Sequence, residues 1–577
     1  MNLKTTLILL LLSQLTYSCV HAEEATTGTI KQHSLRTPLP NLPADHLIRY
    51  LNTFPQVREE CALSEECQRA IKTNASTFRS NDAAVLTTEA AAATTVTVSG
   101  GQTDSASCWG HELDCDENRR FQTPTCPGEH HGWVQSKPAQ VSTFYYQADF
   151  GYIKQQISEL SLMCEPSYIT DSSLECSKYL RFCRGRNLLL DFRDLIQRKE
   201  LIRYHMDVLK PSQILGHCQL NRTRLQAELD HMGALQSWAP ELRNFDELPM
   251  PLMTSGECDL IVDTPTFIMK IDATYNMYHH FCDFFNLYAS LFVNQSHPLA
   301  FHTDTRILIW ETYPYDSPFA ETFKAFSDNR VWTLNDVKGK RVCFRNVVLP
   351  LLPRMIFGLF YNTPLIHGCE GSGLFRAFSE FILHRLQIPF RPPLQQAKLR
   401  ITLLSRRTKY RQILNEDELL EEINANSSYH VQRISFERGL TFIQQLALTR
   451  NTDILIGMHG AGLTHLLFLP NWATIFELYN CEDPNCYKDL SRLRGINYIT
   501  WERDELLYPQ DEGHHPQGGA HAKFTNYRFD PKEFVRLVTK AAEHVYAHNE
   551  FQKFQTQKSA KHEMSKHDEM RKKRDEL

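Results

Sequence analysis

The segment Asp453–Leu469 strongly constrains the fold, because it joins a buried strand to a helix through a glycine-rich turn. Ile454–Ile456 is a short apolar run typical of a fully buried strand, and the apolar segment Leu463–Leu469 predicts the start of a helix. A strand that enters a helix in this way leaves backbone N–H groups facing a crevice at its carboxyl end. These donors and the helix dipole favour an anion such as a phosphate.

The glycine spacing in this turn differs from Gly-x-Gly-x-x-Gly, the dinucleotide fingerprint, so the turn does not predict NAD binding. We expect it to bind the phosphates of a donor substrate instead. The residues assigned to that role are Gly457, His459, Gly460, Ala461 and Gly462. The alternative is a tight turn without a ligand, in which His459 is a structural histidine.

From about residue 258 the chain alternates strands with helices, which predicts parallel sheets covered by helices on both faces. The first series has strands at 266–270, 306–310 and 341–349 and helices at 277–292, 319–326 and 374–386. The second has strands at 400–404, 429–434, 454–456, 474–478 and 498–501 and helices at 416–423 and 440–449. Because 577 residues exceed one core, we predict an α/β protein with two Rossmann-like lobes, 258–395 and 396–550. Two such lobes in series are typical of a nucleotide-sugar transferase whose donor lies in the second lobe.

A basic turn follows the strand at 400–404 and contains Arg406, Arg407, Lys409 and Arg411. Because parallel strands of one sheet end at the same edge, this turn and the glycine turn can face the same crevice. The arginine fork suits phosphate oxygens. We therefore expect Arg406 and Arg411 to bind a diphosphate. A solvated basic turn is the alternative.

Both ends of the chain carry targeting signals. Lys4, the apolar run Leu7–Leu12 and the compact residues before Ala22 predict a secretory signal peptide over 1–22, too short to span a membrane. The charged tail 551–577 ends in a close variant of the Lys/His-Asp-Glu-Leu retention signal. Its residues are Arg574, Asp575, Glu576 and Leu577. The two signals predict the endoplasmic reticulum lumen, binding by a retrieval receptor and no membrane span; a tail that ends in leucine by chance is the alternative.

An oxidising lumen makes disulfides the expected state of most of the 16 cysteines. Loss of Cys19 with the signal peptide leaves 15, an odd number, so at least one thiol should be free or paired outside the chain. The cysteines crowd into two predicted units, a segment at 23–78 and a disulfide-stapled region at 108–257. Cys108 and Cys115 have a superficially zinc-like spacing, but no partner Cys-x-x-Cys follows. No metal site is predicted here.

Three further features concern the surface of the chain. Residues 79–107 contain Ala, Thr, Ser and Gly with almost no large apolar side chain, which predicts a disordered insertion. Sequons fit a luminal glycoprotein and stand at Asn74, Asn221, Asn294 and Asn426. The net charge of −5 provides no basic surplus to displace counterions, which argues against a nucleic-acid partner.

Six segments resemble motifs of glycosyltransferase family 61 in matching order, and the resemblance extends from about residue 110 to the retention signal. They are Asn276–Asp283, Arg341–Phe344, Leu352–Met355, Gly373–Phe378, Gly457–Phe468 and Asp511–Pro516. The resemblance implies a two-lobed GT-B architecture. It also implies inverting transfer of one N-acetylglucosamine from UDP-N-acetylglucosamine (UDP-GlcNAc) to Ser or Thr of folded EGF-like domains in secreted and membrane proteins. The donor side would be 396–550 and the acceptor side 258–395.

Inverting transfer requires a base for the acceptor hydroxyl and positive charge for the leaving UDP. His279 and Asp283 share one face of the predicted helix at i, i+4 spacing, so we expect them to be catalytic. The alternative is that they only cap and pack that helix, and the residues do not decide the base.

Family members can also carry an Asp-x-Asp element before the Arg-Val-Cys-Phe segment. Here the position is Asp328-Asn329-Arg330, where Arg330 removes a carboxylate ligand and adds a repelling charge. We therefore expect no obligatory metal cofactor. A rival function is a luminal lectin or chaperone that keeps the fold without turnover, and assay of UDP-GlcNAc hydrolysis or transfer distinguishes the two.

Overall fold

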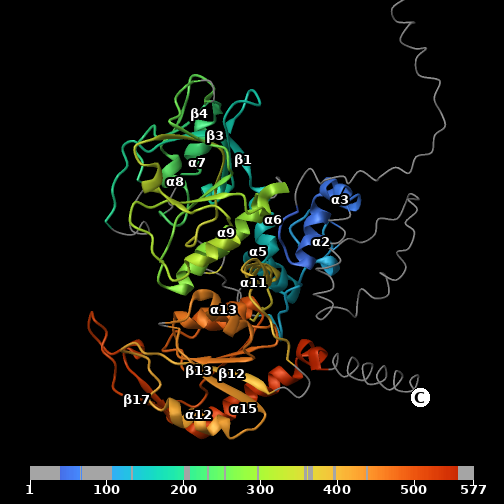
Figure 1. Ribbon diagram of the computed structural model, residues 1–577, viewed down its shortest axis with the longest axis vertical. Coiled ribbons are helices and arrows are strands. Elements are labelled where there is room, and N and C mark those ends of the chain that lie inside the picture. The colour runs from blue at the N-terminus through green and yellow to red at the C-terminus, as the bar shows by residue number, and fades with distance from the viewer. Residues whose placement is uncertain are drawn as a thin grey trace, which may run out of the picture.

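The computed structural model describes most of the chain from residue 39 to residue 555 (Figure 1). The described residues are 39–64, 67, 107–130, 134–199, 208–229, 233–252, 255–294, 298–355, 360, 368–393, 398–436 and 439–555. The predicted signal peptide, Asn74, nearly all of the predicted insertion and the retention signal lie outside these residues. None of the described helices combines the length and the apolar character that crossing a bilayer requires.

The upper part of Figure 1 contains a mixed sheet that has eleven strands among the described residues. Their bounds are β1 Ser161–Glu165, β2 Ser173–Cys176, β3 Cys183–Asp191, β4 Ile214–Gly216, β5 Gln219–Leu220, β6 Phe245–Glu247, β7 Leu260–Val262, β8 Thr266–Met269, β9 Arg306–Ile309, β10 Trp332–Thr333 and β11 Arg341–Leu349. The main path runs β10-β9-β8-β11-β3-β2-β1-β5. β8, β9 and β10 are parallel, and β8 is also parallel to β11.

The strands predicted at 266–270, 306–310 and 341–349 are parallel, as expected, but they do not form a separate sheet, because β3 pairs antiparallel with β11 and with β2. The turns that join β1 to β2 and β2 to β3 are far shorter than a parallel crossover requires. Strands from 108–257 and from 258–395 therefore form one sheet. α7 Arg222–Ala227, α8 Ala239–Leu242 and α10 Leu334–Val337 are short helices in its connections.

The second sheet is parallel throughout, as predicted, with the order β13-β12-β14-β15-β16. Its strands are β12 Leu399–Leu404, β13 Tyr429–Ile434, β14 Ile454–Gly457, β15 Thr474–Glu477 and β16 Asn497–Thr500. Its helices are α12 Glu416–Asn424, α13 Phe442–Arg450, α14 Cys486–Arg494 and α15 Pro531–Ala547. In Figure 1, α13 lies on the side of the first sheet and α12 and α15 lie on the opposite side. A small hairpin, β17 Leu507–Pro509 and β18 Tyr527–Phe529, completes this part.

Two helices join the cores of the two parts. α9, Met277–Val293, is buried along nearly its whole length, and α11, Gly373–Arg385, lies beside it. Between α14 and α9 runs η7, Ala461–Phe468, a 3-10 helix where the sequence predicted a helix from 463. The rings of Phe281 and Phe468 lie 5.5 Å apart, within the range of favourable aromatic pairs. η7, which begins directly after the glycine turn, therefore packs against α9.

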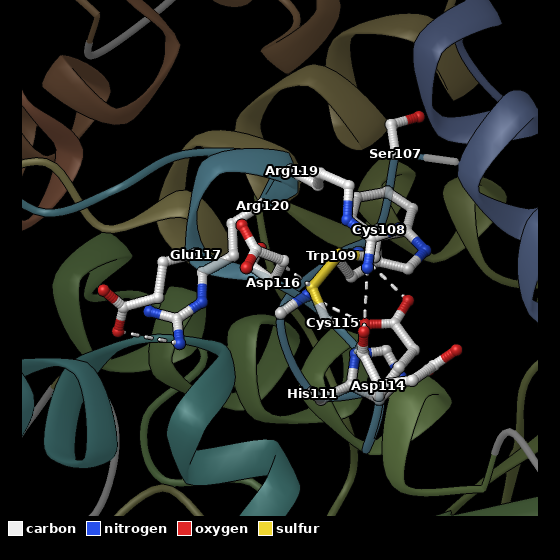
Figure 2. The surroundings of a disulfide bond; sticks show 12 residues. Ser107, Cys108, Trp109, His111, Asp114, Cys115, Asp116, Glu117, Arg119 and Arg120 are labelled. Atoms are coloured by element: carbon white, nitrogen blue, oxygen red, sulfur yellow. Dashed lines mark hydrogen bonds and ion pairs between the residues drawn. A yellow bond between two sulfur atoms is a disulfide. The ribbon is translucent and has the colours of Figure 1, made fainter. Parts of the chain in front are cut away.

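The amino-terminal part of the chain contains the helices α2 Ala44–Thr53, α3 Pro55–Ala62, α5 Lys137–Ala148 and α6 Phe150–Ser158. α6 packs against α9, and His46 of α2 lies 3.0 Å from Glu380 of α11. Disulfides join Cys61–Cys67, Cys108–Cys115, Cys126–Cys369, Cys164–Cys218, Cys176–Cys183 and Cys258–Cys343. Figure 2 shows the Cys108–Cys115 bond, which leaves no thiolate there for zinc. In the part of the chain that the structure describes, the free cysteines are Cys282, Cys481 and Cys486, so the leftover thiol that the odd number predicted is present.

Candidate active site

A pocket of about 900 Å³ lies where the two parts meet. One wall comes from the residues before and within the first turn of α9, including Tyr275, Asn276 and His279. The opposite wall comes from the carboxyl ends of β12 and β14. It contains Arg406, Arg411, Met458, His459, Gly460, Ala461 and Gly462. The basic turn and the glycine turn therefore share one pocket, as the rule for parallel strands predicted; Gly457 lies just behind them as the last residue of β14.

Gly460 lets the two arginines approach the backbone of this turn. Its φ of +153° lies in a region that side-chain-bearing residues rarely adopt. A Cβ atom added there would lie 2.6 Å from Nη1 of Arg406 and 3.6 Å from Nη1 of Arg411. Both guanidinium groups thus lie near the start of η7; a side chain at position 460 would displace that of Arg406 and would leave Arg411 at ordinary contact distance.

Arg411 is held in place by its own backbone and side chain. Its N–H donates to the carbonyl of Thr525 at 2.7 Å, and its Nη1 donates to the carbonyl of His459 at 3.0 Å. Its Nε is buried and has no hydrogen-bond partner among the described residues. An unpaired buried donor is costly, so this Nε is suited to an anionic ligand. Lys523 adds another cation at the pocket and pairs with Asp483 at 2.9 Å.

His459 has a fixed orientation in the pocket wall. Its Nδ1 lies 2.8 Å from Oε1 of Glu477, which is fully buried, and the other oxygen of Glu477 accepts a hydrogen bond from the Tyr498 hydroxyl at 2.5 Å. Because the carboxylate only accepts, Nδ1 of His459 carries the hydrogen. The contact with Glu477 gives His459 a structural role, which was the alternative to ligand binding in the sequence analysis. Its ring nevertheless lines the same pocket as Arg406 and Arg411.

His279 lies on the first turn of α9, which begins after the N-cap Asn276. Its Nδ1 lies 2.9 Å from Oδ2 of Asp272, and the same oxygen accepts a hydrogen bond from Nε of Arg354 at 2.9 Å. Burial opposes ionisation of Asp272, but the hydrogen bonds from His279 and Arg354 hold its pKa below the usual range. The sequence analysis missed Asp272 and Arg354. The signal for Asp272 is its position just after β8, at the carboxyl edge of parallel strands.

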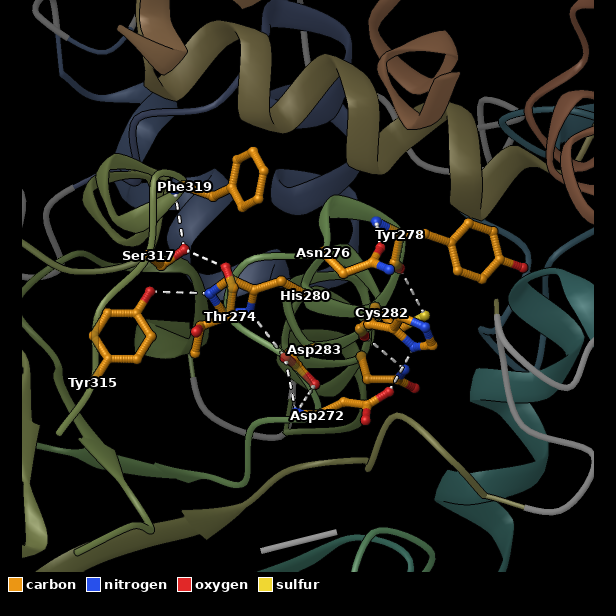
Figure 3. A network of polar contacts seen from close by, with 12 residues as sticks. Asp272, Thr274, Asn276, Tyr278, His280, Cys282, Asp283, Tyr315, Ser317 and Phe319 are labelled. Carbon is orange, nitrogen blue, oxygen red and sulfur yellow. Dashed lines mark hydrogen bonds and ion pairs between the residues drawn. The ribbon is translucent and has the colours of Figure 1, made fainter. Parts of the chain in front are cut away.

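The predicted pairing of Asp283 with His279 is wrong. Asp283 is buried and pairs with His280, whose Nδ1 lies 2.9 Å from its Oδ2 (Figure 3). Asp283 also accepts the backbone N–H of Asp272 at 3.2 and 3.3 Å. Burial lowers the pKa of His280 to about 3, so its ring is neutral near pH 7 and its Nε2 accepts from the Tyr315 hydroxyl at 3.0 Å. Asp283 thus holds the loop that carries Asp272 and is absent from the pocket lining.

The segment Asp328-Asn329-Arg330 does not belong to the pocket lining either. Asp328 accepts a hydrogen bond from the hydroxyl of Thr303, and Arg330 pairs with Asp336 at 2.7 Å. Nδ2 of Asn329 donates to the carbonyl of Thr305 at 2.9 Å. These contacts connect loops of the first sheet and give the three residues a structural role there.

Comparison with known proteins gives a consistent result. Residues 277–476, which include His279 and both turns, match the family model "Glycosyltransferase 61". The chain is 69% identical over 514 residues to the EGF domain-specific O-linked N-acetylglucosamine transferase of Drosophila melanogaster, covering 89% of this chain and 92% of that protein. The proteins of the same name from Pan troglodytes and Gallus gallus are each 48% identical, over 444 and 448 residues. These alignments cover 76% and 77% of this chain and 83% and 82% of those proteins.

Proposed function

Because this chain belongs to glycosyltransferase family 61, and is therefore a glycosyltransferase, we propose that it moves N-acetylglucosamine from UDP-GlcNAc to Ser or Thr of folded EGF-like domains, with inversion. The observation that carries the proposal is the approach of Arg406 and Arg411 to the glycine turn, opposite His279 in one pocket. The names of the relatives support the sugar and the acceptor. The predicted signals at the two ends support a reaction in the endoplasmic reticulum lumen, with retrieval by a receptor.

The proposed architecture is of GT-B type, with the donor side built on the second sheet and the acceptor side on the first. The diphosphate of UDP binds Arg406, Arg411 and the N–H groups at the start of η7. These groups act where negative charge develops as UDP leaves. Lys523 supports them from the rim of the pocket. This cationic set supplies the charge that a metal ion provides in other transferases, so the proposal includes no obligatory metal.

His279 is the proposed general base. Nδ1 donates its hydrogen bond to Asp272, so in this tautomer Nε2 is the ring nitrogen that accepts the proton of the acceptor hydroxyl. The acceptor oxygen then attacks the anomeric carbon, the bond from that carbon to the diphosphate breaks, and UDP leaves with the electron pair. Attack from the face opposite UDP inverts the anomeric centre. Asp272 stabilises the imidazolium that forms, and Arg354 orients Asp272.

The test uses the purified full chain with labelled UDP-GlcNAc and either a folded EGF-like domain or the same domain reduced and alkylated. We expect one β-linked N-acetylglucosamine on the folded domain and little on the unfolded one, with UDP-glucose as the donor control. Donor binding with neither transfer nor hydrolysis would instead support the rival function of a luminal lectin or chaperone.

A further inference from the structure

We propose that two neighbouring loops on the α9 side of the pocket form the docking surface for the acceptor domain, with Tyr275 and Tyr313 as its contact residues. The loops, 270–276 and 310–319, are called here the two-loop platform. They follow β8 and β9, which are adjacent parallel strands, so both leave the sheet at the same edge. The inference rests on the proposed function, because it specifies how that function's acceptor binds.

The platform exposes aromatic surface beside the pocket. Tyr275 is 66% exposed and lines the pocket, and Tyr313 is 45% exposed. The Tyr275 hydroxyl bonds to Asp316 of the other loop. This hydrogen bond raises the pKa of Tyr275. Because Tyr313 belongs to the same loop as Asp316, the bond joins the two loops that carry the tyrosines. Tyrosine is enriched among the residues that dominate protein interfaces, because it adds large amphipathic area at low cost in conformational entropy.

The platform is held in shape by polar contacts between its loops (Figure 3). Ser317 donates from Oγ to the carbonyl of Thr274 at 2.8 Å and accepts the N–H of Phe319 at 3.0 Å. Tyr315 binds the buried His280, which in turn pairs with Asp283. A surface held this way is already ordered before a partner arrives, so binding loses little further entropy. This gives the buried His280–Asp283 pair a purpose that the transfer chemistry itself does not require.

The position of the platform indicates that the acceptor domain binds there. The wall opposite carries the donor turns, so the acceptor must approach from the α9 side. A folded domain is too large to enter a pocket of about 900 Å³ and has to rest on its rim while only the reacting side chain enters. Tyr275 lies four residues before His279, in the loop just before the helix that carries the proposed base. A domain seated on Tyr275 and Tyr313 therefore presents its hydroxyl next to His279.

The experiment compares Tyr275→Ala, Tyr275→Phe and Tyr313→Ala with the control Tyr168→Ala. Tyr168 is 75% exposed and lies between β1 and β2, away from the pocket lining. We measure KM and kcat for a folded EGF-like domain, hydrolysis of UDP-GlcNAc without acceptor, and UDP affinity by calorimetry. For Tyr275→Ala and Tyr313→Ala, the KM of the acceptor should rise tenfold or more and the ratio of transfer to hydrolysis should fall, while UDP affinity stays within twofold. Tyr275→Phe keeps the ring, so its KM for the acceptor should stay close to the wild-type value. Tyr168→Ala should have the same KM as wild type.

Unchanged acceptor KM in both alanine variants would overturn the docking surface. So would a loss of UDP affinity as large as the loss of transfer, because it would place the tyrosines in the donor site. Both outcomes differ from failure of the proposed function, in which the wild-type chain itself modifies no folded EGF-like domain.

Discussion

Nδ1 of His279 lies 2.9 Å from Oδ2 of Asp272, although Asp283 stands one helical turn from His279 on the same helix. The carboxylate that orients the proposed base thus comes from the loop before α9. The adjacent His280 pairs with Asp283, so two His–Asp pairs lie side by side. Of these four residues, only His279 belongs to the pocket lining. This arrangement leads to the first prediction.

Replacing His279 by glutamine should lower kcat about 100-fold or more, which is the usual contribution of a positioned base. UDP affinity should change little, because the donor turns lie on the other wall. The measurement is steady-state transfer to a folded EGF-like domain together with calorimetry. His430→Gln, at an exposed position on β13, is the matched control. Transfer by His279→Gln at more than a tenth of the wild-type rate would assign the base elsewhere.

The basic turn offers an internal comparison for donor binding. Arg406 lines the pocket, whereas Arg407, next in the chain, is exposed and absent from the lining. Loss of one charge-assisted phosphate contact costs roughly 1.5–3 kcal/mol, so Arg406→Ala should weaken UDP binding tenfold or more. Arg407→Ala should bind UDP like wild type. Equal UDP affinities for both variants by calorimetry would contradict the assignment.

Transfer should not depend on a divalent metal. The pocket lining includes the cationic side chains of Arg406, Arg411 and Lys523, which we propose face the diphosphate, whereas Asp328 bonds to Thr303 outside that lining. The initial rate with excess EDTA should therefore equal the rate without it, and Asp328→Ala should lower activity only modestly. A fall to background in EDTA that added manganese restores would refute this prediction.

His280 should make the fold sensitive to acid. Its folded-state pKa of about 3 lies below the unfolded value of about 6.5, so the unfolded state binds the proton first and stability is lost as pH falls from 6.5. From pH 7 to pH 5 this site alone contributes a loss of about 2 kcal/mol in the free energy of unfolding. Urea unfolding at both pH values should show that loss in wild type and in His430→Asn, and show it reduced in His280→Asn. Identical pH dependence in all three proteins would exclude a neutral buried His280.

The predicted retention signal makes location testable. If a retrieval receptor reads Arg574–Leu577, as we propose, deletion of these four residues should send active enzyme into the culture medium. The measurement is the ratio of transferase activity in medium and cells. Full intracellular retention of the shortened chain would show that another element holds the protein.

The second sheet was predictable because most of its strands alternate with helices and its central strand β14 is a short apolar run, so the expected bounds agree with β12 to β16 to within one or two residues. The first sheet was predictable only in its parallel part. β4 to β7 have two or three residues each, too few to show a period of two, and β1 to β3 turn back through short loops. These features carry no signal of pairing with β11.

The donor side of the pocket followed from one topological rule, the shared edge of parallel strands, which places Arg406 beside Gly460. The base side did not follow from spacing. Helical periodicity relates His279 to Asp283, but the nearest carboxylate to His279 belongs to a loop whose path depends on tertiary contacts. The contact of Arg354 with Asp272, 82 residues earlier in the chain, could not be predicted for the same reason.

The Cys126–Cys369 disulfide has a consequence for biosynthesis. Its partners stand 243 residues apart, and seven other cysteines lie between them in the sequence. As the nascent chain emerges from its amino terminus, Cys126 meets several of these thiols long before Cys369 has been translated. Correct pairing then depends on thiol–disulfide exchange after most of the first sheet has been made. The yield of native enzyme should therefore be limited by disulfide isomerase capacity in the cell that produces it, more than by the rate of translation.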